Sequence, residues 1–139
     1  MAYVAVPVIR EGTPRNPWVR QCYDMIEQAA TIARQQATLP LVEYRLETAS
    51  PRDFSQQILG RIRDARSVVA VFLPNDPSTP VECALAVGAG KRVLILHQEG
   101  VRVPRILAGL PGVETLNFDR VGPGGALATV TTFLREQRF

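Results

Sequence analysis

Apolar residues along the chain follow two alternating patterns. Short runs in which consecutive positions are apolar are typical of strands buried on both faces, as in the middle of a parallel sheet. Longer segments with apolar positions three and four residues apart are typical of helices that bury one face. The predicted strands cover residues 3–9, 39–46, 68–73, 92–96 and 113–118, and the predicted helices cover residues 17–33, 51–62, 80–89, 104–107 and 125–135.

Local signals at the helix ends agree with these boundaries. Asn16 is a favoured cap residue, and Pro17 stands at the first helical position, where a missing N–H costs nothing. Gly90 suits the left-handed conformation that ends many helices, so we expect it to close the helix over residues 80–89.

The alternation of strands and helices predicts an α/β fold, a flavodoxin-like doubly wound open parallel sheet of about five strands. Neither a repeat nor a low-complexity linker interrupts the pattern, so we expect residues 1–139 to form a single domain. In such sheets ligands bind beyond the carboxyl ends of the strands. The loops that follow the strands are therefore the places to look for chemistry.

The composition fits a globular chain and reduces the classes of partner to be expected. Hydrophobic residues make up 46% and charged residues 21%, and the net charge of +3 is spread along the chain, so no nucleic acid partner is expected. The longest apolar run is too short to cross a bilayer, and the first residues do not follow a signal-peptide layout. Two cysteines and one histidine without metal-ligand spacing predict no metal site and favour a cytoplasmic setting.

The loop after the predicted strand 68–73 carries the most informative chemistry. Residues 74–84 read PNDPSTPVECA and contain two carboxylates, Asp76 and Glu82, six positions apart. The loop ends at a helix start, whose backbone N–H groups point into the crevice beyond the sheet. A carboxylate held there can attack an electrophilic carbon while polar groups of the loop hold the substrate.

Both carboxylates also have a purely structural interpretation. Thr79-Pro80-Val81-Glu82 matches a capping box, in which Thr79 caps the helix and Glu82 reaches back to its backbone N–H. Asp76 stands before a proline, where aspartate is a frequent turn residue. On the residues alone the capping box is the favoured interpretation of Glu82.

A family resemblance changes this balance. Residues 65–71, 79–86 and 90–96, which read ARSVVAV, TPVECALA and GKRVLIL, resemble the nucleoside 2-deoxyribosyltransferase family. That family includes the nucleotide N-glycosidases that cleave CMP or deoxynucleoside monophosphates. Its signature is a hydrophobic strand, a polar loop, a glutamate near the helix start, small residues and a Gly-Lys turn. Residues 3–10, YVAVPVIR, are similar to the family's first strand and the substrate loop after it.

The resemblance implies a function and a set of site residues. Glu82 matches the family's nucleophile, which attacks the anomeric carbon and forms a glycosyl ester that water or a second base resolves. Asp76 matches the position at the sugar's 5′ end, where a carboxylate favours nucleosides, because it would repel a phosphate. Ser78 with the helix-start N–H groups, and Arg10, are the alternatives that would accommodate a phosphate. The family further implies a homodimer or higher homo-oligomer, and no metal or organic cofactor.

One position departs from the family pattern. Members usually carry an aspartate just before the central strand that assists the leaving base, whereas here Arg66 follows Ala65 and Asp64 is displaced by two positions. Either another residue takes this role, with Glu47 after the second predicted strand as the first substitute, or the activity has changed.

The remaining candidates are Tyr3, Thr79 and His97, which we assign to substrate binding together with Arg10, Glu47 and Ser78. Tyr3 belongs to the first predicted strand, and His97 ends the fourth at the ligand-binding edge. The sequence thus predicts a hydrolase or transferase acting on a nucleoside or nucleotide. The alternative is a nucleotide-sensing or signalling domain of the Toll/interleukin-receptor kind, either non-catalytic or cleaving NAD.

Overall fold

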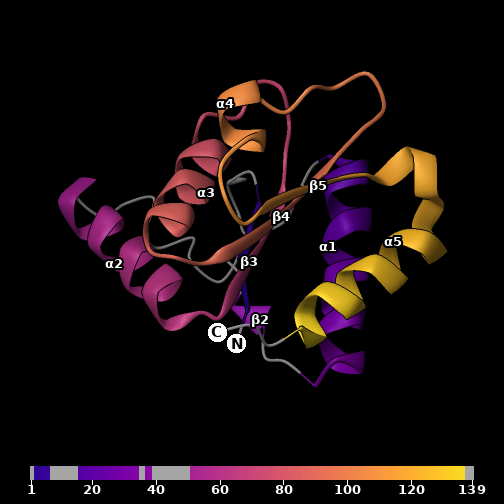
Figure 1. Ribbon diagram of the computed structural model, residues 1–139, viewed down its shortest axis with the longest axis horizontal. Coiled ribbons are helices and arrows are strands. Elements are labelled where there is room, and N and C mark those ends of the chain that lie inside the picture. Colours follow the sequence, from indigo (N-terminus) through magenta and orange to yellow (C-terminus); the bar gives the residue numbers. More distant parts are fainter. Residues whose placement is uncertain (1, 7–15, 35–36, 39–50, 137–139) are drawn as a thin grey trace.

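A computed structural model describes residues 2–6, 16–34, 37–38 and 51–136 of the chain. Strands and helices alternate along it, as the apolar pattern predicts (Figure 1). The elements are β1 (Ala2–Ala5), α1 (Pro17–Ile32), β2 (Ala37–Thr38), α2 (Pro51–Asp64), β3 (Ser67–Val71), α3 (Ser78–Gly88), β4 (Arg92–His97), α4 (Arg105–Ala108), β5 (Val113–Asn117) and α5 (Phe118–Arg135).

The strands form one parallel sheet in the order β2-β1-β3-β4-β5. This is the order of flavodoxin-like sheets, and it confirms the predicted α/β architecture. Four strands have four to six residues, and β2 as described has two. The predicted strand 39–46 lies entirely outside the described residues, and β2 precedes it at residues 37–38.

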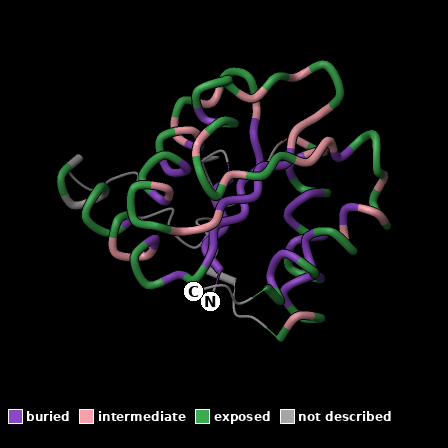
Figure 2. The backbone as a smooth tube through the Cα atoms, in the orientation of Figure 1, coloured by how far each residue is buried: buried purple, intermediate pink, exposed green. Residues whose placement is uncertain are grey.

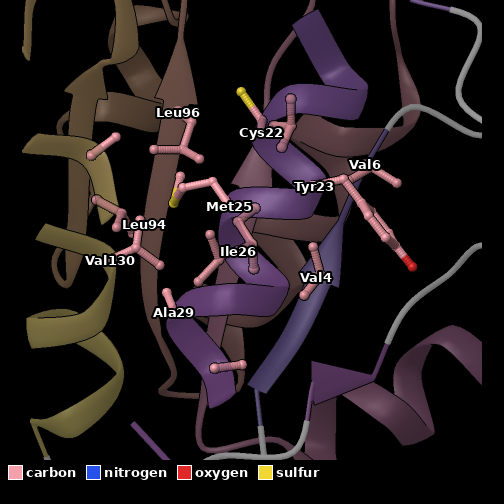
Figure 3. Packing of buried hydrophobic residues seen from close by; sticks show 14 of the residues in the cluster. Val4, Val6, Cys22, Tyr23, Met25, Ile26, Ala29, Leu94, Leu96 and Val130 are labelled. Carbon is pink, nitrogen blue, oxygen red and sulfur yellow. The ribbon is translucent and has the colours of Figure 1, made fainter. Parts of the chain in front are cut away.

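Helices cover both faces of the sheet, α1 and α5 on one side and α2, α3 and α4 on the other (Figure 1). Successive residues of β3 point to opposite faces: Val69 and Val71 join the core under α1 and α5, while Val68 and Ala70 join the core under α2 and α3. In the first core, Met25 of α1 points toward β4 and its Leu94 (Figure 3). Burial on both faces is why these strands read as uninterrupted apolar runs.

The tube view shows the strands buried and the outward faces of the helices exposed (Figure 2). Within the described residues, no helix combines the length and the apolar character needed to cross a membrane. The last helix differs from its prediction, because α5 begins at Phe118 rather than near residue 125 and bends at Gly122, where φ is +74°.

The strand order of the sheet reverses once, between β1 and β3. β2 lies on one side of β1 and β3 on the other, so the connections that leave β1 and β3 diverge. A crevice opens beyond the carboxyl ends of the strands at such a point, and ligands of open α/β sheets bind there. The loop after β3 and the start of α3 lie next to this position.

Candidate active site

The central contact of the site joins Glu82 of α3 to Tyr3 of β1. The Tyr3 hydroxyl donates a hydrogen bond to Glu82 Oε2 at 2.8 Å, across 79 positions of sequence. Tyr3 is fully buried, and Glu82 is 5% exposed. The first strand and the helix after the third strand thus meet at the switch point of the sheet through a buried carboxylate and its donor.

Burial gives Glu82 an unusual acidity. Desolvation raises the pKa of its carboxyl from 4.5 to about 7, with a further increase from the charge of Asp76, while the hydrogen bond from Tyr3 opposes the rise. A carboxyl that titrates near neutrality is available in both protonation states under ordinary conditions. Strongly shifted groups of this kind gather at functional sites, because catalysis needs acids, bases and nucleophiles tuned to the working pH.

The capping-box interpretation of Glu82 is wrong. The helix begins at Ser78, the residue before it forms no side-chain cap, and the Thr79 N–H donates to Asp76 rather than to Glu82. Glu82 instead turns inward, where Tyr3 binds it. The expected local pairing is lost because a carboxylate closer to the helix start occupies the N–H group that the box requires.

Asp76 organises the start of α3. Its Oδ1 accepts the Ser78 N–H at 3.1 Å and its Oδ2 accepts the Thr79 N–H at 3.3 Å. The Thr79 hydroxyl also donates to Oδ2. Asp76 therefore takes the capping role that the sequence suggested for Thr79, and the turn interpretation of Asp76 describes part of what it does.

Two cavities adjoin this helix start, and Pro77 and Ser78 line both of them. The first, of about 370 Å³, contains Glu82 and has mainly apolar walls. Its other lining residues are Ser55, Ile58 and Leu59 of α2 and Val81 and Leu85 of α3. The second, of about 570 Å³, contains Asp76 and has mostly polar walls, to which Asn16, Asn75 and Gln98 contribute. Leu73 and Pro74 complete its lining.

The structure brings some of the sequence-predicted residues together and not others. Tyr3, Asp76, Ser78, Thr79 and Glu82 surround the start of α3. His97 ends β4, half-buried, with its Nδ1 3.1 Å from the Gln98 carbonyl oxygen, and it lines neither cavity.

Two further candidates, Arg10 and Glu47, lie outside the described residues. Asp64 and Arg66 precede β3, at its amino end, and both are exposed. Neither lines the cavity that contains Glu82, so the departure from the family pattern at residue 66 does not touch this part of the site.

Sequence reasoning missed the wall that α2 contributes. Ile58 and Leu59 fit the apolar face of a helix that packs on the sheet, and the pattern did not distinguish core from cavity. Val81 and Leu85 lie one helical turn apart and are 57% and 39% exposed, too open for simple core residues. In the sequence, only the four-residue spacing of Val81 and Leu85 on the helix that carries Glu82 could have indicated this apolar surface.

Within the part of the chain that the structure describes, His, Cys, Asp and Glu side chains form no group of three that could hold a metal ion. The two cysteines are buried and free, and burial raises the pKa of each thiol to about 12. Neither thiol is therefore a ready nucleophile at neutral pH.

Comparison with known proteins finds structural neighbours and no sequence relative. No protein-family model matches the chain, and no curated protein matches it in sequence. Among solved structures, it is similar to the CMP N-glycosidase BcmB of Clostridium botulinum, with a TM-score of 0.63, 13% identity, and coverage of 92% of this chain and 97% of that one. It is also similar to FerB of Paracoccus denitrificans, a flavoenzyme NAD(P)H:(acceptor) oxidoreductase, with a TM-score of 0.54, 13% identity, and coverage of 96% and 94%.

At this level of identity the two likenesses show a related α/β fold. Both neighbours are enzymes, and each matches over nearly its whole length. A fold of this kind supports many unrelated activities, so any specific function depends on the residues of the site.

Proposed function

We propose that this protein is an enzyme that cleaves the N-glycosidic bond of a nucleoside or nucleoside 5′-monophosphate through a covalent intermediate on Glu82. The observation that carries the proposal is the buried contact between Tyr3 and Glu82 beside a cavity that Glu82 lines. The fold shared with a CMP N-glycosidase supports it. The finer choice between hydrolase and deoxyribosyltransferase depends on whether water or a second base enters afterwards.

The proposed reaction has two steps at one carbon. Tyr3 binds Oε2 of Glu82, so we assign the attack to Oε1 of the ionised carboxylate. A bond forms between Oε1 and the anomeric carbon while the carbon–nitrogen bond breaks, and its electron pair leaves with the base, which takes up a proton from solvent water. Water, or the nitrogen of a second base, then attacks the same carbon and gives up its proton to solvent, and the ester bond breaks to restore the carboxylate, as in retaining glycosidases.

The two cavities suggest how the substrate lies. The apolar cavity around Glu82 suits a planar base, and the polar cavity around Asp76 suits the hydroxyl-rich end of a sugar. They share Pro77 and Ser78, so a substrate lying across these residues would occupy both. The carboxylate of Asp76 would repel a phosphate, which favours nucleosides.

Base release measured by chromatography tests the proposal. The substrates are a panel of nucleosides, their 5′-monophosphates and NAD, and the proteins are the wild type and Glu82→Gln. Glu27→Gln is the matched control, because it makes the same chemical change at an exposed position of α1. We expect release that Glu82→Gln abolishes by at least about a thousandfold and Glu27→Gln retains, as for loss of a covalent nucleophile.

Other outcomes are equally informative. Full activity in Glu82→Gln contradicts the nucleophile assignment. Release from NAD alone moves the protein to the NAD-cleaving alternative. If none of the substrates is cleaved, but one of them raises the melting temperature, a sensing domain explains the chain better.

A further inference from the structure

Positive charge gathers at the amino edge of the sheet, opposite the candidate site. The net charge of the chain is +3, and in the sequence the basic residues stand along its whole length. In the fold, five of them lie where a helix ends or a strand begins: Arg34, Arg63, Arg66, Lys91 and Arg135. We call this group the basic edge. In Figure 1 the strands begin on the lower side, whereas α4 and the loop after β4 lie on the upper side.

One half of the basic edge lies at the end of α2. Arg63 is in the last turn of that helix, and Lys91 Nζ donates a hydrogen bond to its carbonyl oxygen at 2.9 Å. Ser67 of β3 pairs with Arg92 of β4, so Arg66 and Lys91 precede neighbouring positions on strands about 4.8 Å apart. Three cations from three segments therefore meet at the amino ends of two adjacent strands.

The other half lies at the ends of α1 and α5. Arg92 of β4 donates hydrogen bonds to two carbonyl oxygens at the end of α5, which joins that helix to the start of the strand. Arg135 Nη2 in turn donates to the Ile32 carbonyl oxygen at 3.5 Å, and Arg34 follows two positions later. The basic edge is therefore continuous from α2, across β4, to α1.

The arginines of the basic edge are available to a partner in solvent. All four are exposed, and none of them forms an ion pair with another described residue. Two carboxylates lie nearby. Asp64 is exposed between two of the arginines, and Glu136 is bound by Arg92, with 2.8 Å between Nη2 and Oε2. The surface therefore keeps an excess of positive charge.

The chemistry of the basic edge fits the phosphodiester backbone of a duplex. Guanidinium groups bind phosphate oxygens through paired N–H donors, better than a lysine does. A nucleic acid duplex carries one phosphate charge about every 1.7 Å of its axis, so a band of cations can contact several phosphates at once. Among the described side chains no aromatic ring is exposed, so the base stacking that holds single strands is missing here.

A bilayer surface fits less well. Stable attachment to a membrane needs apolar side chains that enter the headgroup region in addition to basic residues. Among the described residues with exposed large apolar side chains, only Ile32 is hydrogen-bonded to a residue of the basic edge. One isoleucine falls short of that requirement.

We propose that the basic edge binds the phosphate backbone of a double-stranded nucleic acid, whatever its base sequence. The sequence alone predicts no such partner, because the five cations are spread over residues 34–135 and only the fold brings them together. The inference does not depend on the proposed function, since the cavity that contains Glu82 adjoins the carboxyl ends of the strands. A duplex at the amino edge leaves that cavity open.

A purely structural role for these cations has a different signature. The carboxyl-terminal end of a helix attracts positive charge, and Arg63 and Arg135 stand in the last turns of α2 and α5. Arg34, Arg66 and Lys91 lie outside the helices, so this attraction explains only part of the group. If the cations serve stability alone, replacing them lowers the melting temperature and leaves nucleic acid binding unchanged.

Fluorescence anisotropy of a labelled DNA duplex of about 20 base pairs and arbitrary sequence tests the proposal. The proteins are the wild type, the double variant Arg63→Glu with Arg66→Glu, and the double variant Arg102→Glu with Arg105→Glu. The second double variant is the matched control. It makes the same change in net charge at exposed positions in and before α4, at the opposite edge of the sheet.

The expected result is salt-dependent binding that needs the basic edge. At about 50 mM salt the wild type binds with a Kd in the micromolar range, and its affinity falls about 10- to 100-fold by about 200 mM salt, as for about three phosphate contacts. Arg63→Glu with Arg66→Glu weakens binding at least about tenfold and makes the salt dependence shallower, because phosphate contacts are lost. The control weakens binding by less than about threefold.

A second pair, Arg34→Glu with Arg135→Glu, repeats the test at the ends of α1 and α5, so that the result does not depend on the stability of one variant. Unchanged affinity in either pair, with the melting temperature intact, overturns the proposal. Absence of binding by the wild type at low salt does so too, as does equal weakening in the control. Binding to vesicles of phosphatidylcholine and phosphatidylserine without binding to the duplex would replace the nucleic acid by a membrane. Base release is measured separately, and its absence would overturn the proposed function alone.

Discussion

The carboxyl group of Glu82 is buried at the cost of free energy of folding. Its ionised form is costly to bury, and one hydrogen bond from Tyr3 offsets only part of that cost, so its pKa stays near 7. A glutamine would avoid the cost and still accept the hydrogen bond. The sheet therefore holds an acid where a neutral group would be more stable, the pattern expected when function opposes stability.

The effect of Glu82 on stability can be measured through its pH dependence. The pKa rises from 4.5 to about 7 on folding, so the folded state binds more protons between these values. The stability due to the protonated group is complete below about pH 4.5 and is lost as the pH rises through about 7. We expect Glu82→Gln to exceed the wild type in free energy of unfolding by roughly 1–3 kcal/mol at pH 8.

Urea unfolding at pH 5 and pH 8 checks this expectation. The difference between Glu82→Gln and the wild type should largely close at pH 5, where both side chains are neutral. Parallel stabilities of the two proteins across this range would mean that Glu82 does not titrate as a buried group.

Removing the donor to Glu82 should shift the pH profile of activity. The hydrogen bond from Tyr3 lowers the pKa of Glu82, so in Tyr3→Phe that pKa rises above about 7. Because the ionised carboxylate attacks, the rising limb of kcat/KM against pH moves to higher pH, and activity at pH 7 falls about tenfold and recovers in more alkaline buffer.

Tyr23→Phe is the control for this experiment. Tyr23 is also buried, but it lies in the core under α1 and α5, away from Glu82. Its substitution should leave the position of the rising limb unchanged. An unshifted limb in Tyr3→Phe would show that the hydrogen bond does not set the acidity of Glu82 during turnover.

At the residue scale, the sequence was enough to select Asp76 and Glu82 as candidates, but it did not reveal their hydrogen-bond partners. Asp76 and Glu82 stand out in the sequence because two carboxylates flank a helix start. The capping box failed because Asp76, three positions earlier, took the Thr79 N–H, a competition that a four-residue motif cannot reveal. Tyr3 was expected at the substrate, but its contact with Glu82 spans 79 positions and depends on which strands are neighbours.

At the scale of an element, the end of α3 was predicted correctly from local rules. Gly90 has φ of +77°, and its N–H donates to the Val87 carbonyl oxygen while the Lys91 N–H donates to that of Ala86. These two hydrogen bonds form a Schellman motif, which closes the helix and turns the chain into β4. Such ends are predictable because every group involved lies within six residues.

Gly90→Ala should therefore destabilise the protein. A Cβ at Gly90 would meet nothing within 4 Å, so its cost comes from the positive φ alone. We expect a loss of about 1 kcal/mol in the free energy of unfolding, measured by urea titration. Gly88→Ala is the matched control, because Gly88 ends the same helix, has equally open space and does not have positive φ.

The two substitutions should differ in sign. Gly88→Ala replaces glycine in a helical conformation and should be neutral or stabilising by up to about 1 kcal/mol. Equal losses at both positions would mean that the backbone conformation of Gly90 is not what closes α3.

At the scale of the whole molecule, the order of the strands brings the residues of the candidate site together. The alternating pattern predicted a parallel sheet, since every strand is followed by a helix, but it does not state which strands are neighbours. The structure pairs Tyr3 with Val68, so β1 lies directly beside β3. That pairing brings the Tyr3 hydroxyl to the helix that follows β3, and only the complete sheet could reveal it.

The same architecture makes a prediction about the residues before β3. Asp64 and Arg66 lie at the amino end of that strand, whereas ligands of open α/β sheets bind beyond the carboxyl ends. Neither residue lines the cavity with Glu82, whose far wall comes from Ser55, Ile58 and Leu59 of α2. If the site is where Glu82 places it, neither Asp64→Asn nor Arg66→Ala should change kcat/KM for base release by more than about twofold.

Leu59→Arg should behave differently, because it places a charged side chain on the wall of the cavity that Glu82 lines. Leu59 is 38% exposed, so the substitution should be tolerated by the fold, with a small change in melting temperature. We expect it to raise KM at least about tenfold, since a long cation would occupy the space of the base. A loss of activity in Asp64→Asn together with normal activity in Leu59→Arg would place the leaving base at the opposite edge of the sheet.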